Sequence, residues 1–221
     1  MTLFLAIDGG NSKTEVLLAD TAGTVLGYAR GIGSNHQTAG GMSEAMSRLD
    51  QLVRAASAQV EVVERPALAS VYLAGADLPV ELVALTDAIN AAGWAEKSIV
   101  DNDTFALLRA GTESPDAVAI VCGAGTNCVA RAADGRTVRF PSLGQITGDW
   151  GGVLRARDPL LFGVITERLL SAAPHAEISL VTDPPVVGAA LLGLDALGID
   201  GPAHETLRTE VRRLLATGEP E

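Results

Sequence analysis

The beginning of the chain alternates between apolar runs of strand length and apolar stripes of helical period. Residues 3–7 form an apolar run, and strands follow at 15–20 and 25–30 after short polar turns. A stripe with a 3.6-residue period predicts a helix over 41–59. The unit then continues with a strand at 68–74, a helix at 80–92 and a strand at 98–100. We therefore expect a β-β-β-α-β-α-β unit over residues 3–103, with the first three strands antiparallel.

The same order of patterns starts again after a linking helix at 104–110. The predicted elements are strands at 117–122, 128–132 and 137–143, a glycine-rich loop at 144–152, a helix at 159–172, a strand at 177–181, and helices at 185–197 and 204–216. An internal repeat of this kind predicts an α/β protein with two like domains that face each other across a cleft. The expected domains are residues 1–103 and 104–221.

Composition and charge narrow the class of function. The chain of 221 residues is 48% hydrophobic and only 4% aromatic, so its core must consist mainly of aliphatic side chains. The formal net charge of −11 argues against a broad nucleic-acid surface. No apolar stretch reaches the length of a membrane span, and no basic signal-peptide start is present. With Cys122 and Cys128 interpreted as reduced core residues, a cytoplasmic protein is expected.

The first strand ends in a turn with the features of an anion site. Gly9 and Gly10 permit a tight bend with exposed backbone N–H groups, and Lys13 adds a positive charge beside them. Asp8, at the carboxyl end of a buried strand, is suitably placed to hold Mg²⁺ through water. The spacing is not that of a P-loop. On this stretch alone, a plain hairpin with a glycine turn is an equal alternative.

A second glycine turn occurs at the equivalent place in the second unit. Gly123-Ala124-Gly125-Thr126-Asn127 follows the strand at 117–122, so each domain would contribute one phosphate-binding turn to the cleft. A third polar group, Asp101-Asn102-Asp103, follows the strand at 98–100. Ligands of open α/β sheets collect at the carboxyl ends of strands, so this group is also a candidate for the site.

Taken together, these motifs resemble those of the actin-like ATPase and sugar-kinase superfamily, and more closely N-acetylglucosamine kinases of the BadF/BadG/BcrA/BcrD ATPase type. The resemblance covers almost the whole chain in the family's order. It is carried by residues 6–14 and 121–127 as the two phosphate motifs, and by Ser34-Asn35-His36, Asp101-Asn102-Asp103, Gly148-Asp149-Trp150-Gly151-Gly152 and the stretch 185–191.

The resemblance implies two ribonuclease H-like domains and ATP–Mg²⁺-dependent phosphorylation of the 6-hydroxyl of an amino sugar. Asp103 would be the general base that accepts the hydroxyl proton. Its alternative role is an N-cap carboxylate for the helix at 104–110. The other implied roles are Asp8 for Mg²⁺ through water, Gly9, Gly10, Ser12, Lys13 and Thr14 on one side of the triphosphate, Gly123, Gly125 and Thr126 on the other, and Asn35 and Asp149 on the sugar.

Two other functions are compatible with the family. Some of its ATPases activate dehydratases and carry an iron–sulfur cluster at a dimer interface, but Cys122 and Cys128 sit in strand patterns rather than in loops. A module that binds nucleotide or sugar without turnover is the other alternative. His36 is left out of the chemistry, and Trp150 is left either as a sugar-stacking or a packing residue. The sequence does not distinguish N-acetylglucosamine from glucosamine or another hexose, and it is compatible with a homodimer.

The second unit is shorter than the first by one helix and one strand. Its loop reaches Gly152 and passes almost directly to the helix at 159–172. By resemblance, Gly148–Gly152 matches the sugar-site loop, while Gly151–Arg155 matches the end of an adenosine motif that normally lies much further along. We therefore expect an internal deletion near residue 152, exposed apolar sheet surface, weak ATP affinity and reduced or absent kinase activity.

Overall fold

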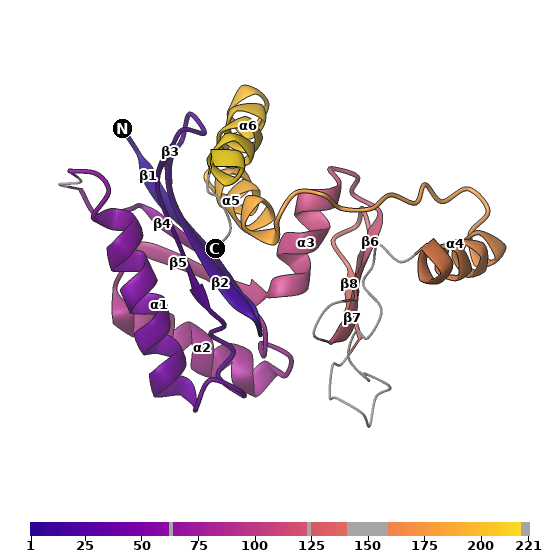
Figure 1. Ribbon diagram of the computed structural model, residues 1–221, viewed down its shortest axis with the longest axis horizontal. Coiled ribbons are helices and arrows are strands. Elements are labelled where there is room, and N and C mark those ends of the chain that lie inside the picture. The colour runs from indigo at the N-terminus through magenta and orange to yellow at the C-terminus, as the bar shows by residue number, and fades with distance from the viewer. Residues whose placement is uncertain (62–63, 123–124, 141–158, 218–221) are drawn as a thin grey trace.

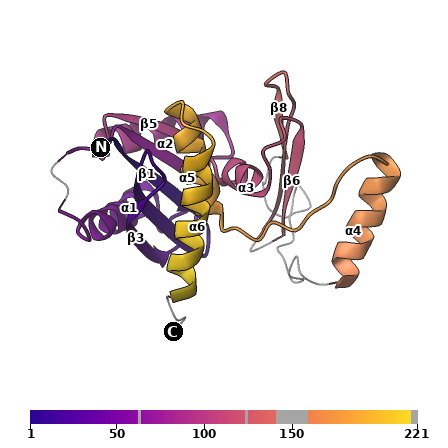
Figure 2. The same ribbon diagram turned by 90° about the horizontal axis from the view of Figure 1, so that it is seen from above.

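A computed structural model describes residues 1–61, 64–122, 125–140 and 159–217. The described part contains two sheets and six helices, and α3 lies between the two sheets in both views (Figures 1 and 2). The mixed α/β class predicted from the sequence is confirmed. In this part of the chain, no helix combines the length and apolar character needed to cross a bilayer.

The first sheet has five strands in the order β3-β2-β1-β4-β5. The strands β1 (Leu3–Gly9), β2 (Lys13–Asp20) and β3 (Val25–Ile32) form the predicted antiparallel meander. The strands β4 (Leu68–Leu73) and β5 (Lys97–Asn102) then add in parallel beside β1. This arrangement brings the carboxyl ends of β1, β4 and β5 to one edge of the sheet.

Both faces of this sheet are covered, which explains why β1 is apolar without interruption. Leu5 and Ile7 point to the face that packs against the helices α1 (Met42–Ser57) and α2 (Pro79–Ala92). Phe4 and Ala6 point to the opposite face, against α5 (Pro185–Ala196) and α6 (Pro202–Thr217). Alternate side chains therefore enter two different cores.

The helices α5 and α6 thus lie on the sheet formed by the beginning of the chain (Figure 1). Ser70 Oγ of β4 donates a hydrogen bond to the carbonyl of Ala189 in α5, at 2.7 Å. Gly188 lets α5 approach α3 (Asp103–Gly111) closely, because a Cβ there would come within 1.7 Å of the carbonyl oxygen of Ala106. The boundary of the two domains between residues 103 and 104 stays a prediction.

The second sheet has three antiparallel strands in the described part of the chain, β6 (Ala117–Cys122), β7 (Thr126–Arg131) and β8 (Thr137–Arg139). Val129 and Ala119 pack with Leu108 of α3 on one face. On the other face, Val118 and Val138 stand in one cross-strand row and are 61% and 72% exposed. Among the described residues, therefore, a core forms on only one face of this sheet.

The predicted strand over 177–181 is wrong. These residues have no regular secondary structure, and Leu180 is exposed. A strand needs a neighbour that accepts and donates backbone hydrogen bonds, and the apolar pattern alone does not supply one. Instead, Val181 packs against Gly111 at the end of α3. The helix α4 (Pro159–Ala172) forms where it was predicted, yet it stands apart from both sheets in Figures 1 and 2.

Candidate functional site

The predicted first glycine turn closes the hairpin between β1 and β2. The N–H of Gly10 donates to the carbonyl of Lys13 at 2.9 Å, so this amide is used inside the turn. A Cβ on Gly9 would come within 2.7 Å of Ser34 Oγ and within 2.5 Å of the Leu73 side chain, so any larger residue would have to displace both side chains. The buried Thr14 hydroxyl donates to Ser34 Oγ at 2.9 Å. The turn is therefore held against the loop that follows β3.

Lys13 lies beside this turn but is paired with a carboxylate of its own strand. Its ammonium forms an ion pair with Glu15, which stands two residues further along β2 on the same face. Glu15 is buried and also accepts a hydrogen bond from the Tyr28 hydroxyl at 2.7 Å. The sequence analysis treated Glu15 only as the start of a strand. Lys13 thus shares its charge between Glu15 and any anion in the turn.

Asp8 and Asp103 are brought together at the carboxyl edge of the first sheet. Asp8 is buried near the end of β1, and burial, the nearby Asp103 and Glu15 raise its pKa to about 8, while Lys13 lowers it. Burial and Asp77 raise the pKa of Asp103 to about 6, opposed by the N–H of Thr104 and by Arg139. Two carboxyl groups with raised pKa values at one sheet edge are typical of a site that receives a cation or a proton.

Asp103 is the first residue of α3, and Asn102 is the N-cap. The Asn102 side chain accepts a hydrogen bond from the Thr104 N–H at 3.1 Å, as an N-cap residue does. This assignment resolves the alternative considered for Asp103, because the capping role belongs to its neighbour. The Asp103 carboxylate stands at the helix N-terminus, where the helix dipole favours a negative charge.

Asn35 lies in the loop that faces the glycine turn. Its Nδ2 donates to Asn11 Oδ1 at 2.6 Å, and its Oδ1 accepts from the N–H of Gln37 at 2.9 Å. Gly75, with a φ of +82°, lies so close that a Cβ would come within 2.4 Å of Asn35 Oδ1. Asn35 is therefore buried and oriented by three neighbours. His36, beside it, has a buried Nδ1 with no hydrogen-bond partner among the described residues.

Of the remaining predicted site residues, some lie in the described part of the chain and others do not. Ser12 is exposed at the tip of the β1–β2 turn. Gly125 and Thr126 lie at the turn between β6 and β7 of the second sheet. Gly123, Asp149 and Trp150, together with the proposed deletion point near residue 152, lie outside the described residues. Across the described ranges, no cluster of three or more His, Cys, Asp or Glu is arranged as a metal site.

Two residues at this edge were not predicted from the sequence. Asp77 follows β4 and is almost fully buried, and Arg139 reaches it from β8 with an Nη1–Oδ1 distance of 2.7 Å. Asp77 could have been found, because Gly75-Ala76-Asp77 ends a buried strand at the same edge as Asp8. Arg139 carries no such signal, since its partner depends on how the second sheet is placed against the first.

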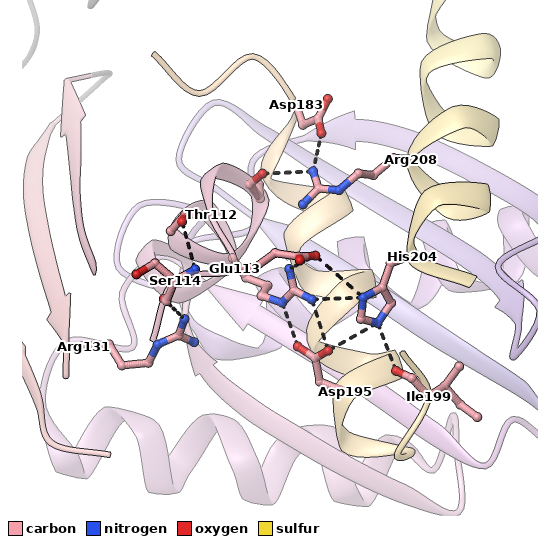
Figure 3. Close-up of polar contacts among 11 residues, drawn as sticks. Thr112, Glu113, Ser114, Arg131, Asp183, Asp195, Ile199, His204 and Arg208 are labelled. Atoms are coloured by element: carbon pink, nitrogen blue, oxygen red, sulfur yellow. Dashed lines mark hydrogen bonds and ion pairs between the residues drawn. The ribbon is translucent and has the colours of Figure 1, made fainter. Parts of the chain in front are cut away.

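A cavity of about 640 Å³ lies away from these residues, at the other end of α3. Glu113, Asp195 and His204 point toward one another there (Figure 3). The guanidinium of Arg109 donates to Asp195 at 2.8 and 3.2 Å, and His204 Nε2 lies 3.0 Å from the carbonyl of Ile199. These charged groups satisfy one another and join α3, α5 and α6. The cavity contains none of the predicted catalytic residues.

A profile of the BadF/BadG/BcrA/BcrD ATPase family matches residues 5–167, which is well over half of the chain. The chain belongs to this family. A curated relative, an N-acetylmuramic acid/N-acetylglucosamine kinase of Clostridium acetobutylicum, is 28% identical over 152 residues. That match covers 68% of this chain but only 49% of the relative, so the chain spans about half the length of the curated relative that it matches.

Two solved structures share the fold of this family member. One is a proposed N-acetylglucosamine kinase from Chromobacterium violaceum, with a TM-score of 0.56 and 17% identity, covering 99% of this chain and 76% of that one. The other is a proposed N-acetylglucosamine kinase from Porphyromonas gingivalis, with a TM-score of 0.53 and 20% identity, covering 94% and 76%. At these identities the likeness concerns the fold, and it supports the predicted actin-like ATPase architecture.

Proposed function

We propose that the chain transfers a phosphoryl group from ATP to the 6-hydroxyl of an amino sugar, N-acetylglucosamine or a close relative. The observation that carries the proposal is the pairing of Asp8 and Asp103 at the carboxyl edge of the first sheet, beside a glycine turn and the Asn35 loop. Membership of the family and the printed activity of the Clostridium acetobutylicum relative support the same chemistry.

Asp103 is proposed as the general base. With a pKa of about 6, its carboxylate is ionised at neutral pH yet basic enough to take a proton from a hydroxyl as the phosphoryl group moves onto it. Phosphoryl transfer otherwise depends on alignment and on charge stabilisation. Asn102, as the cap of α3, fixes the turn from which the Asp103 carboxylate projects.

The residues around Asp8 fit a hydrated Mg²⁺ bound together with a nucleotide. Asp8, Glu15 and Asp103 gather three carboxyl groups at this edge, and Lys13 is a cation that lowers the pKa of Asp8 against the larger effect of burial. A divalent cation would favour the ionised form of Asp8, and Mg²⁺ usually binds one or two carboxylates, water and substrate phosphates. Bound Mg²⁺ would supply neutralisation of the charge on the transferred phosphoryl group. Gly9, Gly10, Ser12, Lys13 and Thr14 remain the proposed phosphate side, with Gly123, Gly125 and Thr126 opposite.

Asn35 is the proposed sugar contact among the described residues. A side-chain amide offers two donor hydrogens and two acceptor lone pairs, and one of each is used toward Asn11 and Gln37. The remaining pair can bind a hydroxyl that both donates and accepts. Asp149 is proposed as the second sugar contact on the strength of the family resemblance.

The direct test measures ATP-dependent phosphorylation of each of four sugars: N-acetylglucosamine, glucosamine, N-acetylmuramic acid and glucose. We expect turnover with at least one amino sugar, and a loss of about 10²–10⁴-fold in kcat for Asp103→Asn, with an unchanged circular dichroism spectrum. Asp87→Asn, on the exposed side of α2, is the matched control and should leave kcat unchanged. Full turnover in Asp103→Asn would remove the general-base role.

The pH dependence of kcat provides a second test of Asp103. As the pH falls through about 6, the Asp103 carboxylate becomes protonated and can no longer accept the hydroxyl proton. We therefore expect kcat to decline on the acid side with a midpoint near that value. A rate that stays constant down to pH 4.5 would contradict the assignment.

A module that binds sugar or nucleotide without turnover is the second candidate function. The observation in its favour is the outer face of the second sheet, which no described residue covers, because a lobe without a core on both faces is poorly suited to close over a nucleotide. Calorimetric titration with each sugar and with a non-hydrolysable ATP analogue separates the two. Micromolar binding of either without any phosphorylation would favour the binding module.

The dehydratase-activator alternative gains no support from Cys128. This residue lies within β7, opposite Ile120 of β6, and burial raises the pKa of its thiol. A cysteine that ligates a cluster acts as a thiolate, which a raised pKa disfavours.

A further inference from the structure

Arg139 connects the second sheet to the edge of the first sheet that carries Asp103. Its Nη1 donates to Asp77 Oδ1 at 2.7 Å, and its Nη2 donates to the backbone carbonyl of the same residue. The Arg139 side chain is 20% exposed and that of Asp77 is 7% exposed. Because both groups are largely withdrawn from water, their attraction is screened less than that of a surface pair. The two-pronged contact also fixes the direction of the guanidinium.

The contact continues from Asp77 into the first sheet. Asp77 Oδ1 accepts a second hydrogen bond, from Asn102 Nδ2, at 3.1 Å. The Asp77 N–H is in turn anchored to Glu81 Oε2 at 3.2 Å, at the start of α2. Asp77 is therefore held through both its backbone and its side chain. Its carboxylate contacts Arg139 and Asn102 at the same time and so connects the two residues.

Asn102 transmits this contact to the first turn of α3. Its Oδ1 accepts hydrogen bonds from the Thr104 N–H at 3.1 Å and the Thr104 hydroxyl at 2.5 Å. Asn102 and Thr104 are both about 1% exposed, so water cannot replace a lost partner at low cost. Asp103 lies between these two fixed residues. Its backbone position consequently depends on a chain of contacts that begins on β8.

Electrostatic interactions also link Arg139 to Asp103. Asp77 raises the pKa of Asp103, and Arg139 lowers the pKa of Asp77, Asp101 and Asp103. Arg139 is thus a cation that the second sheet supplies to three carboxylates at the carboxyl edge of the first sheet. Without it, the Asn102 amide would be the one remaining hydrogen-bond donor to the largely buried Asp77 carboxylate among the described residues, which is costly.

We propose that Arg139 is a positioning residue for Asp103, acting through Asp77 and Asn102 and tying the placement of the base to the placement of the second sheet. This inference rests on the proposed function insofar as Asp103 is the base. The set of contacts itself does not depend on that function, and it can be tested separately.

The test compares Arg139→Met, Arg139→Lys and Arg136→Met by hydrogen exchange and by kinetics. Arg136 lies in the same hairpin, is exposed and pairs with Asp134, so it is a matched control. We expect the Thr104 amide to exchange roughly tenfold faster in Arg139→Met, because a charge-assisted contact behind its cap is lost. Amides of β1 and the Arg136→Met variant should be unchanged.

The kinetic measurements separate positioning from general stabilisation. Arg139→Met should lower kcat about tenfold with the KM for ATP unchanged, and Arg139→Lys, which keeps the charge but not the two-pronged contact, should recover only part of that loss. Asp77→Asn should lower kcat similarly, and the double variant with Arg139→Met should be no worse than either single change.

Two results would overturn the proposal: Thr104 exchange in Arg139→Met equal to that in Arg136→Met, or faster exchange with an unchanged kcat. If the wild-type protein phosphorylates none of the sugars, the proposed function fails, and the exchange experiment still decides whether Arg139 positions the first turn of α3.

Discussion

In the five-stranded sheet, Leu5 and Ile7 enter one core while Phe4 and Ala6 enter another, and helices cover both faces. In the three-stranded sheet, Val129 and Ala119 pack on α3, but Val118 and Val138 face outward without cover in the described part of the chain. Both sheets begin with the same antiparallel meander. The comparison teaches that a strand pattern is a local property, whereas a core depends on which helices return to the sheet.

Truncation of equivalent side chains in the two sheets should have very different costs. Ile7→Ala removes a fully buried side chain from β1 and should lower the free energy of unfolding by about 2–5 kcal/mol. Ile120→Ala, on the outer face of β6, should change it by no more than about 0.5 kcal/mol. Urea unfolding followed by circular dichroism measures both. Equal losses would mean that the outer face of the second sheet is covered in solution.

Matched glycine substitutions extend the comparison to the helices. Gly188→Ala places a Cβ against the carbonyl oxygen of Ala106 and should cost about 1–3 kcal/mol by forcing α5 away from α3. Gly163→Ala, in α4, would place its Cβ more than 4 Å from any described residue outside the helix and should be neutral or stabilise the helix by up to about 1 kcal/mol. Thermal unfolding of both variants checks the contrast, and a destabilising Gly163→Ala would indicate that α4 packs against another surface.

The free energy of unfolding should depend on pH because of the Asp8 carboxyl in the first sheet. The folded-state pKa of Asp8 is raised from 3.8 to about 8, so the folded protein binds more protons than the unfolded chain between these values. Its stability should therefore fall as the pH rises through that window, by at most about 1.4 kcal/mol per pH unit from this group. Asp8→Asn should flatten the decline in a series of melting temperatures from pH 4 to 8. An identical slope in Asp8→Asn would contradict the buried, protonated carboxyl.

The smallest effect on stability is expected on the outer face of the second sheet. Val118→Thr combined with Val138→Thr should change the free energy of unfolding by no more than about 0.5 kcal/mol. The same pair of changes should reduce binding of a hydrophobic dye and any self-association seen by light scattering, since it removes apolar exposed surface. An unchanged dye signal would show that this face is not the accessible apolar surface.

Local patterns predicted most elements of the fold. The apolar run of β1, the 3.6-residue stripe of α1 and the glycine turn beyond Asp8 each depend on neighbours in sequence, and each is where it was expected. The strand expected over 177–181 failed because ladder formation depends on a partner strand. The return of α5 and α6 to the first sheet was likewise beyond a local pattern.

The candidate site was predictable to the same extent. Asp8 lies near the carboxyl end of β1 and Asp103 directly follows β5, and β4 pairs in parallel with both strands, so their meeting at one edge could be expected once the strands are taken as parallel. The pairing of Lys13 with Glu15 and the capping role of Asn102 were not predicted, because each side chain has several possible partners close by in the sequence. Arg139 could not be found, because its partner lies 62 residues earlier in the chain and depends on the packing of two sheets.

The return of α5 to β1 and β4 has a consequence for synthesis of the protein on the ribosome. The hydrogen bond between Ser70 and Ala189 joins residues 119 positions apart, and the core around Phe4 needs side chains from α5 and α6. The emerging chain can form the meander and its contacts with α1 and α2 early. The second face of that sheet must wait until α5 and α6 have left the exit tunnel. During that interval the nascent five-stranded sheet exposes an apolar face, which favours binding of chaperones.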